Sequence, residues 1–333
     1  MTRPSRSSAL GLVFAASALL LGVTPAAGPA AAQSGPTIYV IGGKPDDPFW
    51  SKVKKGADDA GLVVAARGGK VIWLGPQTYD NLGPDAANLI RTALGQKPNA
   101  IVGPNWVPEA MDDAFKAVTA TKVPLVIYNS GGIEKAKELG ALNYVGSDEY
   151  LAGLAGGRYF GKAGAKKVLC VNTLPGLTNT EARCRGVIEG IAEAGGGASQ
   201  LPLPSTTFGD PTAVTEAIKA AILRDPAVDG VITIGAGDAT SAATAIQQAG
   251  AQGRVRLGCF DLDQPVLERI KAGTQLFAID QQPYFQGYLA VSLLFAKVSF
   301  GLDLPTRPIL TGPGIVDAAN IDATLAGVRA GAR

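Results

Sequence analysis

The sequence predicts an α/β protein whose chain forms two successive lobes, each built on a parallel sheet. Hydrophobic residues make up 47% of the 333 residues, which supports a sizeable core and argues against disorder. Short apolar runs alternate with longer amphipathic stretches, and this alternation indicates βαβ units. The alternation restarts after Asn143-Tyr144-Val145, so we expect two similar lobes in sequence.

The elements of the first lobe follow from the periodicity of its apolar residues. Short apolar runs predict strands at Thr37–Ile41, Lys70–Leu74, Ala100–Val102 and Pro124–Tyr128. Amphipathic stretches between them predict helices at Phe49–Ala60, Pro84–Leu94 and Pro108–Thr119. Pro48 lies close to the start of the first helix, where proline is favoured.

The second lobe repeats the same order, beginning with a helix. The predicted helices are Tyr150–Phe160, Asn179–Ala194, Pro211–Leu223 and Thr240–Ala249. The predicted strands are Lys167–Val171, Gly230–Ile234 and Arg254–Cys259, with an edge-like stretch at Gln200–Pro204.

The N-terminus has the features of a secretory signal peptide. Arg3 and Arg6 precede an apolar run at Ala9–Val23, and Ala30-Ala31-Ala32 supplies small residues for cleavage after Ala32. An uncleaved anchor helix is the alternative, but the run is short for a membrane span. Because no Cys lies near the cleavage point, we expect a protein that is free in the periplasm rather than attached to lipid.

Composition excludes several kinds of function. Without the signal peptide, Lys plus Arg falls from 30 to 28 and equals Asp plus Glu at 28, so no nucleic-acid partner is expected. The absence of His excludes Ser-His-Asp and Cys-His catalysis and the usual zinc sites, although mechanisms that use only carboxylates remain. The sequence contains neither a phosphate-binding glycine motif nor an EF-hand loop, so we expect no cofactor and no required metal.

The three Cys leave two interpretations open. In an exported protein, Cys170 and Cys184 could close a small loop around Leu174-Pro175-Gly176 as a disulfide. Cys259 lies in an apolar run and is expected to be a buried small residue. The alternative is three unpaired thiols.

The candidate binding residues follow the predicted strands, because ligands of parallel sheets bind beyond the carboxyl ends of the strands. Aromatic and short polar side chains recur there. Aromatic rings can cover the apolar faces of a sugar, while Asp, Asn, Gln and Arg can pair with its hydroxyls. These residues are Asp47, Phe49, Trp50, Asn105, Trp106, Asn129, Asp238 and Asp261. Two alternatives are that one ring of Phe49 and Trp50 belongs to the core and that Asp261 only caps a helix.

Five motifs in order resemble the periplasmic binding proteins of the ribose/galactose type, which supply ABC-type sugar importers. They are Asp47-Pro48-Phe49-Trp50 with Gly56-Ala57, Val123–Asn129, Arg183-Cys184-Arg185-Gly186-Val187, Gly258-Cys259-Phe260-Asp261, and Asp280-Gln281-Gln282-Pro283 with Gly287. The resemblance places three further residues at the ligand: Arg183, Gln281 and the second-lobe aromatic Phe208. It places Arg183 there instead of Arg185. The sequence departs from the family pattern at Gly237, where an Asn is usual, and at Asn129-Ser130.

The resemblance implies two doubly wound lobes that close on a ligand about a hinge. Crossings are expected near Val145–Ser147, Gln281–Gln282 and Leu310–Gly312. The implied division is a signal peptide at 1–32, an N-terminal lobe of 36–145 plus 283–310, and a C-terminal lobe of 146–281 plus 311–328. The Cys170 to Cys184 spacing is similar to that of a branch with a cystine beside the pocket.

The implied function is capture of a monosaccharide or related polyol by a monomer that delivers it to the permease of an ABC importer. One alternative is a sensor that docks on a chemoreceptor with a sugar-like signal such as a furanone. Another is a glycosidase in which a carboxylate pair such as Asp47 and Asp261 acts as acid and base.

Overall fold

The computed structural model describes residues 35–333. The predicted signal peptide and its cleavage point lie outside the described residues. Within residues 35–333, no helix combines the length and the apolar character that crossing a membrane requires.

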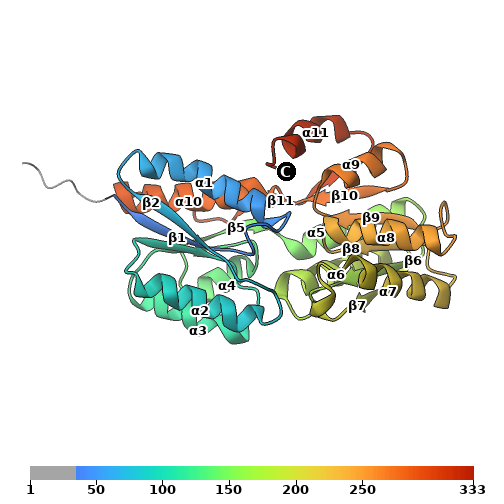
Figure 1. Cartoon of the computed structure of the whole chain (residues 1–333), viewed down its shortest axis with the longest axis horizontal. Coiled ribbons are helices and arrows are strands. Elements are labelled where there is room, and N and C mark those ends of the chain that lie inside the picture. The colour runs from blue at the N-terminus through green and yellow to red at the C-terminus, as the bar shows by residue number, and fades with distance from the viewer. Residues whose placement is uncertain (1–34) are drawn as a thin grey trace, which may run out of the picture. The chain divides into compact units, whose positions relative to one another are not determined.

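The first lobe is built on a six-stranded parallel sheet in the order β11-β5-β4-β3-β1-β2 (Figure 1). Its strands are β1 (Thr37–Ile41), β2 (Lys70–Leu74), β3 (Ala100–Gly103), β4 (Leu125–Tyr128), β5 (Asn143–Ser147) and β11 (Ile309–Gly312). The helices of this lobe are α1 (Trp50–Ala65), α2 (Leu82–Gly95), α3 (Pro108–Ala120), α4 (Gly132–Glu138) and α10 (Pro283–Phe300). β1 lies between β2 and β3, so chain direction across the sheet reverses at β1, which is where such sheets bind ligands.

The second lobe repeats this order as β12-β10-β9-β8-β6-β7. Its strands are β6 (Lys167–Asn172), β7 (Gly197–Pro202), β8 (Gly230–Thr233), β9 (Arg256–Phe260), β10 (Phe277–Asp280) and β12 (Gly314–Val316), of which β12 alone runs antiparallel. Its helices are α5 (Glu149–Lys162), α6 (Thr178–Ala192), α7 (Pro211–Arg224), α8 (Ala236–Gln248), α9 (Gln264–Lys271) and α11 (Ile321–Arg329), with a 3-10 turn at Ser205–Thr207. The predicted fold class, two parallel-sheet α/β lobes, is confirmed.

The chain passes between the lobes three times. It crosses from β5 to α5, from β10 to α10 and from β11 to β12, and each crossing spans only a few residues. These positions lie at or beside the three crossings that the family resemblance implied. Three short connections allow the lobes to rotate about one hinge while each sheet stays intact.

Two helix pairs pack closely because glycine lies at each contact. A Cβ on Gly56 of α1 would collide with the backbone oxygen of Tyr284 in α10. A Cβ on Gly186 of α6 would collide with the backbone oxygen of Tyr150 in α5. Each pair brings a helix that begins at the hinge against a helix whose N-terminus faces the ligand cleft.

The structure contains the disulfide between Cys170 of β6 and Cys184 of α6, with a Cα–Cα distance of 5.6 Å. Cys259 is buried in β9 with a free thiol. The disulfide joins β6 to the helix that carries Arg183, so it fixes that helix against the second sheet.

Candidate functional site

A cavity of about 580 Å³ lies between the lobes at the carboxyl ends of both sheets. Segments that follow nine of the strands contribute to its lining, as expected for two facing parallel sheets. Ten of the eleven predicted binding residues line it: Asp47, Phe49, Trp50, Trp106, Asn129, Arg183, Phe208, Asp238, Asp261 and Gln281. We call this cavity the cleft.

Asn105 is the predicted residue that the structure does not bring to the cleft. Its side chain is fully buried, and its amide donates to Asp112 Oδ1 at 2.6 Å. Its backbone carbonyl accepts from Ser130 Oγ at 2.9 Å. Asn105 thus joins the ends of β3 and β4, while its neighbour Trp106 reaches the cleft.

Asp47 organises the start of α1. Its Oδ1 accepts hydrogen bonds from the backbone N–H groups of Phe49 (2.8 Å) and Trp50 (3.1 Å), two donors that a helix N-terminus leaves free. Tyr79 donates its hydroxyl to Oδ2 at 3.3 Å. Burial raises the pKa of Asp47, and these hydrogen bonds oppose the rise.

Aromatic rings form one wall of the cleft. The Trp50 ring packs edge-on against Phe49, with ring centroids 5.2 Å apart, and against Trp106, with centroids 5.3 Å apart. Trp50 is 7% exposed and Trp106 is 2% exposed, so both rings belong to the core as well as to the cleft. For Trp50, the core role and the cleft role were expected as alternatives, and the structure combines them.

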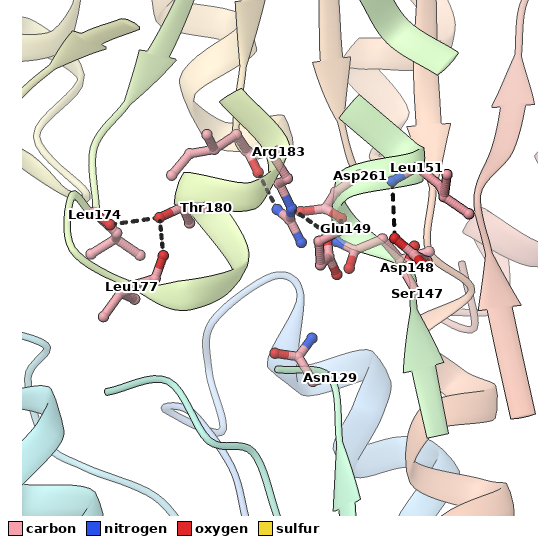
Figure 2. Close-up of polar contacts among 12 residues, drawn as sticks. Asn129, Ser147, Asp148, Glu149, Leu151, Leu174, Leu177, Thr180, Arg183 and Asp261 are labelled. Atoms are coloured by element: carbon pink, nitrogen blue, oxygen red, sulfur yellow. Dashed lines mark hydrogen bonds and ion pairs between the residues drawn. The ribbon is translucent and has the colours of Figure 1, made fainter. Parts of the chain in front are cut away.

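Arg183 is the buried cation of the second lobe. Its Nε donates to Glu149 Oε2 at 2.6 Å and its Nη1 donates to the carbonyl of Ile234 at 2.7 Å. Its guanidinium lies 4.5 Å from the centre of the Phe260 ring. Figure 2 shows Arg183 beside both Glu149 and Asp261, with Asn129 at the end of β4 below them.

Asp261 is held at the end of β9 in a left-handed conformation with φ of 68°. Its Oδ1 accepts from Gln281 Nε2 at 2.5 Å, and its backbone N–H donates to the carbonyl of Ile279 at 2.8 Å. Burial raises the pKa of Asp261 to about 6, although Arg183 opposes the rise. This carboxyl therefore changes charge close to neutral pH.

Asp238 occupies the first turn of α8, where a carboxylate favours the helix dipole. Thr173 donates its hydroxyl to Asp238 Oδ2 at 2.7 Å. Burial raises the pKa of Asp238 to about 6, and the Thr173 hydrogen bond opposes the rise. Gly237 beside it lines the cleft with no other atom near the position of a Cβ.

Three amide oxygens on cleft residues are buried without a hydrogen-bond partner among residues 35–333. They are Asn129 Oδ1, Asn179 Oδ1 and Gln281 Oε1. An unpaired buried acceptor costs on the order of 1–3 kcal/mol. A ligand that donates hydroxyl groups would remove this cost, so the three oxygens suit a polyhydroxylated molecule.

Direct contacts join the two lobes around the cleft. Lys52 Nζ of α1 donates to the carbonyl of Leu262 at 2.7 Å. Both the N–H and the hydroxyl of Thr178 donate to the carbonyl of Trp106 at 3.0 Å. The rings of Tyr79 and Phe208 meet edge to face with centroids 5.2 Å apart.

Lys52, Tyr79 and Asn179 line the cleft but are not among the residues predicted from the sequence. Tyr79 follows the predicted strand Lys70–Leu74, so the rule that selected the other residues also applies to it. Lys52 and Asn179 lie within helices, and no sequence pattern distinguished them from solvent-facing polar residues.

No group of three or more His, Cys, Asp or Glu side chains in the described part of the chain is arranged to hold a metal ion. The buried carboxylates of the cleft, Asp47, Asp238 and Asp261, accept hydrogen bonds from protein donors. What this arrangement can do chemically is to enclose a hydroxylated ring between aromatic faces, carboxylates and amides.

Comparisons with known proteins agree with this geometry. A carbohydrate transporter from Acidothermus cellulolyticus 11B, solved in complex with myo-inositol, is 33% identical with a TM-score of 0.81, and the match covers 90% of this chain and 100% of that one. The xylose/arabinose-binding protein XylF of Sulfolobus acidocaldarius is 25% identical over 296 residues, 83% of this chain and 69% of the relative.

A solute-binding protein of an ABC transporter from Burkholderia graminis C4D1M, solved with D-arabinose, is similar in fold. It is 22% identical with a TM-score of 0.74, and the match covers 86% of this chain and 96% of that one. The resemblance to sugar-binding proteins of ABC importers, first seen in five short motifs, is thereby confirmed. Since the model of the periplasmic binding protein domain matches residues 38–302, the chain belongs to that family.

Proposed function

We propose that this protein captures a neutral monosaccharide or cyclic polyol in its cleft and delivers it to the permease of an ABC importer. The protein acts by binding and lobe closure rather than by turnover. It works as a monomer that is exported to the periplasm after removal of the segment up to Ala32. Membership of a family of periplasmic binding proteins supports binding without turnover and a place in the periplasm.

The observation that carries the proposal is the composition of the cleft. Hydroxyl partners from both lobes, including Asn129 and Arg183, surround a space whose wall is aromatic at Trp50 and Trp106. A volume of about 580 Å³ lies within the range of roughly 300–1,000 Å³ typical of small-molecule pockets. Closing both lobes on one ring would satisfy its hydroxyls and exclude water.

The charges of the cleft favour a neutral ligand over an anionic one. The carboxylates among its lining residues belong to Asp46, Asp47, Asp80, Asp210, Asp238 and Asp261, whereas the cations are Lys44, Lys52 and Arg183. Arg183 is already paired with Glu149. A phosphorylated or acidic sugar would therefore meet net repulsion, and we expect inositol phosphates to bind far more weakly than myo-inositol.

Isothermal titration calorimetry with a panel of pure compounds tests the proposal. The panel contains myo-inositol, D-xylose, L-arabinose, D-arabinose, common hexoses and a small furanone, and small-angle scattering records compaction. We expect one ring compound to bind one site per monomer and to compact the protein. The absence of both heat and compaction with every member of the panel would refute the proposal. Tight binding of the furanone alone would favour a sensor.

A matched pair of variants tests the site itself. Asn179→Ala removes an amide with an unpaired oxygen from the first turn of α6, whereas Asn88→Ala removes an exposed amide from α2. Loss of one ligand hydrogen bond, about 0.5–1.5 kcal/mol, should weaken binding roughly twofold to tenfold in the first variant only. Release of a reducing end from a disaccharide would instead support a glycosidase.

A further inference from the structure

Gln286 lies behind the cleft, near the start of α10, and its side chain is fully buried. Its Oε1 accepts a hydrogen bond from Nδ2 of the cleft residue Asn129 at 3.1 Å. Its Nε2 donates to the carbonyl of Gln281 at 3.3 Å and to Thr311 Oγ1 at 3.4 Å. Gln286 is not itself among the residues that line the cleft. It therefore connects a residue of the ligand site to two segments at the hinge.

The partners of Gln286 determine which end of its amide is the oxygen. The backbone carbonyl of Gln281 can only accept hydrogen bonds, so the NH₂ group of Gln286 must face it. The hydroxyl of Thr311 already donates its single hydrogen to the same carbonyl at 2.7 Å, so its oxygen also accepts from Gln286. The oxygen of Gln286 is thereby directed at Asn129, whose NH₂ group must face it in turn.

Asn129 has little freedom to turn its amide. Its backbone is left-handed, with φ of 60°, and Figure 2 shows its side chain at the end of β4. Its N–H donates to the carbonyl of Val145 at 3.0 Å, and its carbonyl accepts from the Tyr144 hydroxyl at 2.8 Å. Because Nδ2 is bonded to Gln286, it is Oδ1 that has no partner among residues 35–333. The atom of Asn129 that still needs a partner is therefore an acceptor.

We propose that Gln286 is a positioning residue that fixes the Asn129 amide so that its oxygen, and not its NH₂ group, receives the ligand. The site therefore requires a hydroxyl donor at this position and discriminates against a group of similar size that can only accept. A carboxylate would present an oxygen in either orientation, whereas an amide does so only when its orientation is fixed. This inference rests on the proposed function, because a ring must first bind in the cleft.

Calorimetry with fluorinated ligands tests this inference. The probes are myo-inositol, D-xylose and L-arabinose, each compared with analogues in which one hydroxyl at a time is replaced by fluorine, which cannot donate a hydrogen bond. Asn129→Ala identifies the hydroxyl that faces Asn129, as the position at which fluorination loses its cost in this variant. In the unmodified protein, fluorination of that hydroxyl should weaken binding at least about fivefold, because it leaves a buried acceptor without a partner.

Gln286→Met keeps the approximate size of the side chain but offers no oxygen to Asn129. The carbonyl of Gln281 keeps its hydrogen bond from Thr311, so this variant should fold. The freed Asn129 amide can turn its NH₂ group toward fluorine, so the cost of fluorination should fall below about twofold at that one position and stay unchanged elsewhere. Gln286→Glu keeps an oxygen opposite Asn129 and should restore the full cost. The control Gln247→Met, at an exposed glutamine of α8, should leave every cost unchanged.

The possible outcomes separate a positioning role from a structural one. If Gln286→Met weakens the parent ring and all its fluorinated analogues by the same factor, Gln286 only supports the fold and the inference alone is refuted. Loss of the cost at a hydroxyl that Asn129→Ala does not affect would refute it as well. If no parent ring binds the unmodified protein, the proposed function fails and the inference fails with it.

NMR signals of side-chain amides in the isotope-labelled, ligand-free protein give a second measurement that needs no variant of Gln286. The Asn129 signal, assigned by its absence in Asn129→Ala, should exchange its hydrogens slowly, because its NH₂ group is bonded to a buried oxygen. The exposed amide of Asn88 should exchange fast. Equally fast exchange of both amides would contradict a fixed orientation and overturn the inference, even if Gln286→Met does not fold.

Discussion

The most informative perturbation is Asp261→Asn, because it removes one charge and almost no volume. Burial raises the pKa of Asp261 from 3.8 to about 6. Between pH 3.8 and about pH 6, the folded protein therefore keeps a proton that the unfolded chain has already lost. Stability from this group is fully present below pH 3.8 and is lost as pH rises through 6. Two pKa units correspond to about 3 kcal/mol, of which about 2 kcal/mol falls between pH 4.5 and 7.5.

Urea unfolding of the ligand-free protein at pH 4.5 and pH 7.5 measures this contribution. The free energy of unfolding of the unmodified protein should fall by about 2 kcal/mol more than that of Asp261→Asn over this interval. Asp238→Asn is a second probe, because burial raises the pKa of Asp238 to about 6 as well, with a smaller contribution from the charge of Asp261. Equal pH dependence of the unmodified protein and the Asp261 variant, or a change of opposite sign, would refute the reasoning.

The same carboxyl predicts a pH dependence of ligand binding. A ligand hydroxyl that donates to ionised Asp261 lowers its pKa in the complex, so binding near pH 6 should release protons. Affinity should therefore rise as pH increases through 6 and then become constant. Calorimetry in two buffers of different ionisation enthalpy detects the released protons. No release at pH 6 in a protein that binds the ligand would mean that the ligand does not contact the ionised form.

Three further changes have distinct expected outcomes. Arg183→Ala should abolish ligand binding and also destabilise the fold by about 3–5 kcal/mol, because it leaves the buried glutamate of its ion pair without a partner; an unchanged denaturation midpoint would contradict this. The Cys170→Ser/Cys184→Ser variant should lose about 3 kcal/mol of stability, because it frees a loop with a sequence separation of 14. Urea unfolding measures this loss against the oxidised protein, and an equal midpoint would show that the disulfide adds no stability. Lys52→Met removes a hydrogen bond between the lobes. It should weaken ligand binding roughly tenfold and increase the radius of gyration of the ligand-free protein. The control Lys54→Met, on the solvent face of α1, should change neither quantity.

The sequence predicted the alternating elements well because each has a clear hydrophobic period. The strand Thr37–Ile41 and the strand Lys70–Leu74 have the bounds that were expected, and helix Pro108–Ala120 extends one residue beyond the prediction. Helix α8 begins at Ala236 rather than at Thr240, since glycine and a buried aspartate in its first turn carry no amphipathic signal. The prediction omitted α10, whose apolar residues surround the helix because it packs against both α1 and the first sheet.

The candidate site was predictable wherever a residue directly follows a strand. Trp106 and Asp261 follow parallel strands, whose carboxyl ends meet at one edge of a sheet. The same rule selected Asn105, whose buried amide contacts Asp112 instead of the cleft. Adjacent residues in a turn point in different directions, so sequence position alone does not separate Asn105 from Trp106.

The order of strands and helices, the repeat of that order and the ligand-facing strand ends were determined by the sequence itself, because hydrophobic periodicity and short motifs are local properties. The tertiary structure decided which side chains meet within and across the lobes. The contact between Lys52 and the carbonyl of Leu262 joins the two lobes, and the pairing of Arg183 with Glu149 joins two helices of the second lobe. Their burial also sets the pKa of Asp261, since desolvation depends on everything packed around a carboxyl and not on its neighbours in sequence.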